Sequence, residues 1–261
     1  MFYTQARSCL NRPVIGIFDS GSGGLSVLTA LRRRAPRADV VYFGDIANNP
    51  YGTRSKDVLA ELVQNGCQRL AEHGATEIIA ACNSISYSIL AGATGHDRFI
   101  EMTRPAARMM RRYAGERVLL LATPATVESG IYTEALWSIV ALDELPISEL
   151  AGAIEGEKSD GEISAIIRDA LATRRGNTYD KILLGCTHYP LVQNEIARIA
   201  AEVFPGAQLL DPADAVAEEA VERFASEGEG SIQFLISADS HGFRNRIAPM
   251  FLEGNCSLTI V

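Results

Sequence analysis

Short apolar runs alternate with amphipathic segments along most of the chain, and this alternation limits the folds that it can adopt. Runs with the composition of buried strands cover residues 14–18, 39–43, 77–81, 117–122, 181–184, 207–210 and 232–236. Helical spacing of apolar residues falls between them, over residues 55–73, 160–173 and 190–203. Strands that alternate with helices form a mainly parallel sheet covered by helices on both faces. The sequence therefore predicts an α/β protein.

The pattern occurs twice. Residues 14–84 pass from a strand through a polar turn and a helix to a strand that ends at Cys82, and residues 117–188 repeat this order up to Cys186. The same number of residues separates the first strand from the cysteine in both copies. We expect two pseudo-symmetric open-sheet α/β lobes, with the active site in the cleft between them.

The chain of 261 residues is long enough for two such lobes. We expect the first lobe to contain residues 1–101 and 208–261, and the second to contain residues 102–207. The chain would then cross between the lobes near residues 92–103 and 204–208.

Charge and cysteine content exclude several classes of protein. A net charge of −8 and a pI near 5.1 argue against a nucleic-acid or anionic-membrane partner. Five irregularly spaced cysteines do not form the framework of a secreted disulfide protein, and Cys9, Cys67 and Cys256 carry no motif. Residues 1–12 lack a signal-peptide core, and no apolar stretch has membrane-spanning length. We expect a cytoplasmic protein with reduced thiols.

Three of the apolar runs end in chemically useful side chains. Ligands of open α/β sheets bind beyond the carboxyl ends of the strands, so residues at these positions are candidates for a site. Two thiols presented in this way suggest a pair of bases that act on one small molecule. The residues concerned are Asp19 and Ser20 after the first run, Cys82, Asn83 and Ser84 after the third, and Cys186, Thr187 and His188 after the fifth.

The run Gly21-Ser22-Gly23-Gly24 invites a nucleotide-binding interpretation, but the sequence does not match that motif. The fingerprint G-x-G-x-x-G needs glycine at position 26, which is Ser26, and Asp19 would repel a phosphate. We prefer a tight turn whose backbone N–H groups and helix N-terminus hold a carboxylate. A glycine turn without a ligand is the alternative.

Other interpretations of the polar residues stay open. Buried cysteines are commonly inert, but a polar setting is what turns a thiol into a base. His188 would lie on the same side of an extended segment as Cys186, where the two can exchange a proton. Asp19, Cys82, Cys186 and His188 are all possible zinc ligands, although no ligand-type clustering supports a metal. A cysteine hydrolase would use Cys186 with His188 and would leave Cys82 unexplained.

Taken together, these residues resemble the glutamate racemases, the cofactor-independent enzymes of the aspartate/glutamate racemase superfamily. The likeness runs in order from about residue 14 to about residue 220. Its segments are residues 15–28, 42–45, 50–52, 81–83 and 185–192, with Thr123, Thr126, Ser129 and Tyr132.

The resemblance implies a two-base racemase that interconverts L- and D-glutamate and supplies D-glutamate for peptidoglycan synthesis, and so for cell-wall biogenesis and cell shape. Cys82 would remove the α-proton of the D-enantiomer with help from Asp19. Cys186 would remove that of the L-enantiomer with help from His188 and Glu155. The substrate contacts that it implies are Asp19, Ser20, Tyr51, Gly52, Asn83, Ser84, Thr187 and His188.

No metal or cofactor is expected, because neither the motifs nor the resemblance calls for a Schiff-base lysine. A small amino acid is the expected partner, and a homodimer is an open expectation for the assembly. The chain departs from the family at Ser84, where threonine is usual, and over residues 98–105. These departures bear on the choice of substrate, so a racemase of aspartate or another amino acid stays an alternative. A non-catalytic amino-acid-binding protein is a further one.

Overall fold

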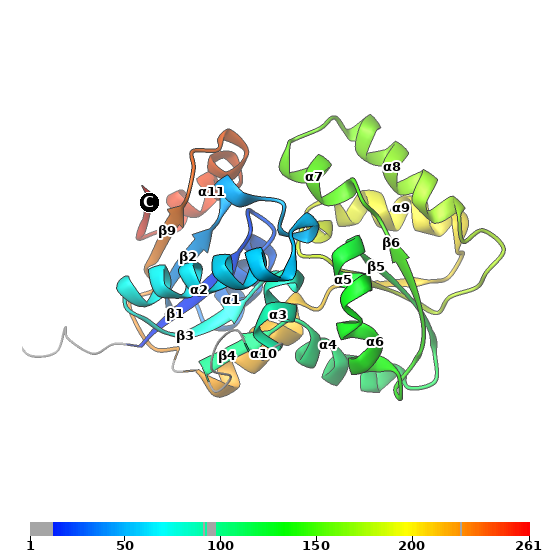
Figure 1. Cartoon of the computed structure of the whole chain (residues 1–261), viewed down its shortest axis with the longest axis horizontal. Helices are drawn as coiled ribbons and strands as arrows, with labels where there is room; N and C mark the ends of the chain where they lie inside the picture. Colours follow the sequence, from blue (N-terminus) through cyan, green and yellow to red (C-terminus); the bar gives the residue numbers. More distant parts are fainter. Residues whose placement is uncertain (1–12, 91, 93–97, 225) are drawn as a thin grey trace, which may run out of the picture.

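The fold consists of two parallel sheets, each covered by helices on both faces (Figure 1). The computed structural model describes residues 13–90, 92, 98–224 and 226–261. Cys9 and part of the first expected crossing between lobes lie outside these residues. The prediction of an α/β fold is confirmed.

The first sheet has six strands in the order β10-β9-β2-β1-β3-β4, and every pairing is parallel. Its strands are β1 (Val14–Asp19), β2 (Asp39–Gly44), β3 (Ala75–Ala80), β4 (Phe99–Glu101), β9 (Ile232–Ile236) and β10 (Cys256–Ile260). The second sheet has four parallel strands in the order β6-β5-β7-β8. They are β5 (Arg117–Ala122), β6 (Ala141–Pro146), β7 (Lys181–Gly185) and β8 (Gln208–Leu210).

The two sheets repeat one strand order. Reading β1 to β4 as the counterparts of β5 to β8, both sheets run second, first, third, fourth, and β9 and β10 extend the first sheet beyond β2. Cys82 follows β3 and Cys186 follows β7, so the two cysteines occupy equivalent places. The pseudo-symmetry predicted from the sequence is therefore present in the strand order.

The return to the first sheet comes later than the sequence predicts. The expected lobe boundary places residue 208 in the first lobe, whereas β8 still pairs with β7 in the second sheet. Its Leu209 and Leu210 pack against the two cores of that sheet, which is why the strand belongs there. The chain then leads into α10 (Ala213–Arg223), which packs against α1 and α4.

Helices enclose each sheet because the strands are buried on both faces. In β1, Ile15 and Ile17 face one core of the first sheet and Phe18 faces the other. The helices of this half are α1 (Leu25–Arg34), α2 (Lys56–Glu72), α3 (Asn83–Leu90), α10 and α11 (His241–Glu253), with the 3-10 turns η1 (Ile46–Asn48) and η2 (Tyr51–Thr53).

The second sheet is covered in the same way. Leu119 and Leu121 of β5 face one core, and Leu120 faces the other. Its helices are α4 (Thr103–Met110), α5 (Pro124–Ser129), α6 (Ile131–Leu136), α7 (Leu150–Glu155), α8 (Asp160–Ala172) and α9 (Gln193–Val203), with the turns η4 (Arg111–Tyr113) and η5 (Tyr189–Val192). Local signals set several of these ends, such as the Ser159–Glu162 capping box that begins α8.

Candidate active site

The strand order fixes where a site can form. In both sheets the first strand lies between the second and the third. The strand order therefore reverses at the first strand, and a crevice opens at its carboxyl end. Asp19 ends β1 beside Cys82, which follows β3, while Cys186 follows β7 in the second sheet. Both cysteines line a single cavity of about 950 Å³, a volume in the range of small-molecule sites.

Most of the predicted substrate contacts line this cavity. Asp19 and Glu155 are not among its lining residues, and instead contact residues that are. The residues predicted from the sequence therefore lie together, in two layers around the cavity. Those that line it are Ser20, Tyr51, Gly52, Cys82, Asn83, Ser84, Cys186, Thr187 and His188.

Cys82 lies in an environment that keeps its thiol protonated. Burial and the nearby carboxylate of Asp19 raise the pKa of the Cys82 thiol to about 12. The backbone N–H of Ile85, in the first turn of α3, and the hydroxyl of Ser20, 3.7 Å from the sulfur, offset part of this rise. The Cys82 thiol is therefore protonated at neutral pH.

Asp19 is fully buried and connects the two halves of the molecule. Its Oδ1 accepts a 2.7 Å hydrogen bond from the backbone N–H of Gly21, and its Oδ2 accepts a 3.1 Å bond from Thr187 Oγ1. Burial raises the pKa of Asp19, whereas His188, Gly21 and Thr187 act to lower it. The net direction is upward, so this carboxyl group holds a proton more readily than a solvent-exposed aspartate.

Cys186 has a different set of neighbours. The chain turns after Cys186, and His188 has helical backbone angles at the start of η5, so the expected extended segment is wrong. The turn still places the His188 ring beside the Cys186 thiol, and its Nε2 lies 2.9 Å from Glu155 Oε2. Burial lowers the pKa of His188, but Cys186, Glu155 and Asp19 raise it by more, and it lies well above its ordinary value. His188 is therefore an imidazolium at neutral pH.

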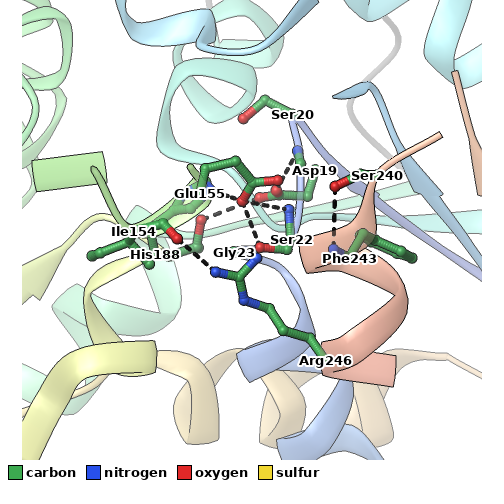
Figure 2. Close-up of polar contacts among 12 residues, drawn as sticks. Asp19, Ser20, Ser22, Gly23, Ile154, Glu155, His188, Ser240, Phe243 and Arg246 are labelled. Carbon is green, nitrogen blue, oxygen red and sulfur yellow. Dashed lines mark hydrogen bonds and ion pairs between the residues drawn. The ribbon is translucent and has the colours of Figure 1, made fainter. Parts of the chain in front are cut away.

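Glu155 ends α7 and contacts the glycine turn of the first sheet (Figure 2). Its Oε2 accepts a 2.5 Å bond from the Ser22 hydroxyl and a 3.3 Å bond from the Ser22 backbone N–H. Burial raises the pKa of Glu155, but His188, Ser22 and Arg246 outweigh it and lower the pKa to about 2. The carboxylate is ionised and balances the charge of His188.

Backbone N–H groups of the glycine turn bind two carboxylates, which are the side chains of Asp19 and Glu155. The backbone N–H of Gly21 binds Asp19, and that of Ser22 binds Glu155. A Cβ atom on Gly23 would lie 2.6 Å from Thr187 Oγ1 and 2.7 Å from His188 Nδ1. Glycine is therefore required here for the close approach of the segment that follows β7.

The hydroxyl group of Tyr51 is bonded within the protein. Its side chain is buried, and the hydroxyl donates a 2.6 Å hydrogen bond to Asp45, which also accepts bonds from Asn48 and Ser237. This network holds the segment in which Gly52 lies against Thr123 of the second sheet. The phenol is thus a structural group, and the neighbouring Gly52, which has no side chain, lines the cavity.

Comparison with known proteins agrees with this geometry. The family model described as Asp/Glu/Hydantoin racemase matches residues 24–220. The glutamate racemase of Aquifex aeolicus is 32% identical over 89% of this chain and 92% of its own. The chain belongs to the Asp/Glu/hydantoin racemase family.

Solved structures of this racemase family are similar along nearly the whole chain. Glutamate racemase from Thermus thermophilus in complex with beta-chloro-D-alanine has a TM-score of 0.77 and 31% identity, and covers 95% of this chain and 96% of its own. Escherichia coli glutamate racemase in complex with L-glutamate and the activator UDP-MurNAc-ala has a TM-score of 0.75 and 27% identity, with 96% and 99% covered. The resemblance drawn from the sequence is confirmed.

Several residues of this racemase site carry no signal that we used in the sequence. Ser22 stands in a turn that we attributed to glycine geometry, and Tyr132, which donates a 2.9 Å bond to Asn83 Oδ1, entered only as a match to the family. Asn49 directly precedes the Pro-Tyr-Gly segment, and this position could have marked it as a candidate site residue. Among the described residues, the Nδ2 atoms of Asn49 and Asn83 are buried without a hydrogen-bond partner. Both residues line the cavity.

The zinc hypothesis finds no support in the geometry of this racemase site. Among the described residues, no three His, Cys, Asp or Glu side chains come together in a way that could hold a metal ion. The same part of the chain contains no helix that is long and apolar enough to cross a membrane.

Proposed function

We propose that this chain is a cofactor-independent glutamate racemase, which interconverts L- and D-glutamate by two-base transfer of the α-proton. The observation that supports it most strongly is the pair of thiols that follow equivalent strands, β3 and β7, and line one cavity. Inversion at the α-carbon removes a proton from one face and returns a proton to the other. Two monoprotic groups supplied from two sheets suit this task.

The proposed reaction uses each thiol once per turnover. With L-glutamate, the Cys186 thiolate takes the α-proton, the C–H electron pair stays on the α-carbon, and the Cys82 thiol delivers its proton to the opposite face. The product is D-glutamate, with Cys186 as thiol and Cys82 as thiolate. The reverse direction starts from that state, so the two sulfurs titrate as a coupled pair.

The surroundings of the two sulfurs support these roles. The raised pKa of Cys82 suits a proton donor. When D-glutamate binds, its α-ammonium group brings a positive charge into the cavity and favours the Cys82 thiolate. On the other side, the His188 imidazolium, held by Glu155, stabilises negative charge near Cys186 and can pass a proton to it.

Donors in the cavity would stabilise the charge that develops on the substrate. Two residues with amide side chains, Asn49 and Asn83, and two with hydroxyl groups, Ser20 and Ser84, line this space. Fixed donors of this kind stabilise a developing carbanion and carboxylate without reorganisation. We assign substrate contacts to these groups, to the Tyr51–Gly52 backbone and to Thr187.

The test is incubation in deuterated water with each enantiomer in turn. We expect loss of optical rotation and incorporation of α-deuterium into the enantiomer that forms, with both signals resistant to chelators and to hydroxylamine. Deuterium incorporation without inversion would contradict the two-base assignment. Hydroxylamine trapping of an acyl-enzyme would favour a hydrolase that depends on Cys186.

The cellular compartment and the oligomeric state of the enzyme are predictions. We expect a cytoplasmic enzyme that supplies D-glutamate for the cell wall, with the two sheets acting as lobes that close on the substrate. A homodimer is the assembly to test, by light scattering of the purified chain with and without glutamate. A mass of one chain, 28.2 kDa, would contradict it.

A further inference from the structure

Arg246 lies on α11, away from the cavity lining and outside the residues that match the family model. Its Nη2 donates a 2.5 Å hydrogen bond to the carbonyl oxygen of Ile154, in the last turn of α7 (Figure 2). This contact joins a helix of the first sheet to a helix of the second. The next residue after Ile154 is Glu155, which binds His188.

The side chain of Arg246 brings a positive charge to a largely buried place. Among the described residues, its Nη1 atom is buried and has no hydrogen-bond partner. A buried cation is costly unless negative charge compensates it. The charge of Arg246 lowers the pKa of Glu155, which identifies that carboxylate as a compensating group. Glu157 also lies close, since a Cβ on Gly242 would contact both Glu157 and Arg246 Nη1.

Glu155 is therefore held by the first sheet from two directions. Ser22 bonds its carboxylate from the glycine turn, and Arg246 bonds the adjoining backbone from α11. The main influences on the pKa of His188 are burial, Cys186, Glu155 and Asp19. Arg246 is not among these, and its hydrogen bond to the end of α7 connects it to His188 through Glu155.

We propose that Arg246 is a positioning residue for the racemase reaction: it fixes the end of α7 so that the Glu155 carboxylate bonds His188, which in turn serves Cys186. This inference rests on the proposed function of the site. It gives the C-terminal helix of the first sheet a role in the proton transfer of the second.

The test compares Arg246→Gln and Arg246→Lys with a matched control, Arg244→Gln. Arg244 is on the same helix, is 46% exposed and pairs only with Asp239 among the ion pairs of the described residues. We expect Arg246→Gln to lower kcat by about 10- to 100-fold with KM changed less than about twofold, because Arg246 does not line the cavity. Arg246→Lys should recover part of the loss, and Arg244→Gln should match the wild type.

A second readout does not depend on turnover. The imidazole of His188 is titrated by nitrogen NMR in each variant, with its signal assigned through His188→Asn. Arg246→Gln should bring the pKa of His188 down toward about 6.5, the ordinary value. In a Glu155→Gln background, the same change at Arg246 should produce no further shift, because the two residues act through one contact.

The outcomes separate the two proposals. An Arg246→Gln variant with wild-type His188 titration and wild-type kcat would overturn the role of Arg246. So would shifts in the pKa of His188 that simply add when Arg246→Gln and Glu155→Gln are combined. If the wild type and Arg244→Gln racemise neither enantiomer, the proposed function fails, and the NMR cycle still decides whether Arg246 acts through Glu155. Thermal unfolding identifies a misfolded Arg246→Gln, and Arg246→Lys then takes its place in both measurements.

Discussion

Each thiol of the site has its own polar partners, and the two sets differ in charge. Cys82 lies beside the carboxyl group of the buried Asp19, whereas Cys186 lies beside the His188 imidazolium. Burial and Asp19 favour the protonated form of Cys82, while His188 favours negative charge near Cys186. The two sulfurs therefore lie in different electrostatic surroundings.

Removal of either sulfur should stop racemisation. Cys82→Ala and Cys186→Ala each delete one of the two proton carriers, so we expect no measurable interconversion while circular dichroism stays close to wild type. The remaining thiol should still eliminate HCl from one enantiomer of a β-chlorinated glutamate, with opposite enantiomers for the two variants. Chloride release from both enantiomers by one variant would contradict the assignment of faces.

Substrate choice should follow chain length. Aspartate is one methylene shorter than glutamate, and one methylene in a fitted pocket changes the rate by about 10- to 200-fold. We expect glutamate to be preferred, and Ser84→Thr to be tolerated because the hydroxyl remains. Progress curves with D-glutamate, D-aspartate and neutral D-amino acids measure this. A faster reaction with aspartate than with glutamate would contradict the preference for glutamate, and only the two-thiol mechanism would remain supported.

The His188–Glu155 pair should produce a bell-shaped dependence of stability on pH. The pKa of Glu155 is lowered to about 2, so its contribution, about 3 kcal/mol, is present above about pH 4.5 and is lost as pH falls. The pKa of His188 is raised, so its contribution is present below about pH 6.5 and is lost as pH rises. The free energies of unfolding in urea of the wild type and of the double variant Glu155→Gln/His188→Asn should differ most between these two pH values. A pH-independent difference would contradict the charged pair.

The sequence identifies residues that follow strands and misses contacts that cross between sheets. The two thiols, Asp19 and His188 stand beside apolar runs, so their position in an α/β sheet can be predicted. The bonds from Ser22 and Arg246 to the end of α7 join segments far apart in the chain. No local pattern encodes such pairs.

At the scale of elements, the inner strands were predictable, whereas three of the four edge strands were not. The inner strands β1, β3, β5 and β7 are continuous apolar runs because helices cover both faces. The strands that we missed are β4, β6 and β10, and each lies at the edge of a sheet. β6 contains Asp143 and Glu144 and ends at Pro146, which are residues typical of exposed edges.

The turn between β1 and α1 should tolerate no side chain at Gly23. A methyl group there would meet Thr187 and His188, so Gly23→Ala should separate the sheets and lower kcat by about 100-fold. Gly161→Ala is the control, because nothing lies within 4 Å of a Cβ at that position on α8. Kinetics and thermal unfolding of both variants measure this, and full activity of Gly23→Ala would contradict the required close approach.

At the scale of the whole molecule, the cavity is formed by both sheets and belongs to neither. Its volume of about 950 Å³ is large for an amino acid, so we expect the two halves to close when glutamate binds. Hydrogen exchange with and without D-glutamate should show protection of η2 on one side and of α7 and the start of α8 on the other. Protection confined to one half would contradict closure.

The order of strands along the chain also has a consequence for synthesis on the ribosome. Everything from α4 to β8 lies between β4 and β9, so the four-stranded sheet is complete before β9 is made. Until then β2 is an open edge, and an unpaired edge of this kind is a template for association between chains. The nascent protein therefore carries a finished half beside an unfinished one, and α11, with Arg246, is made only after β9.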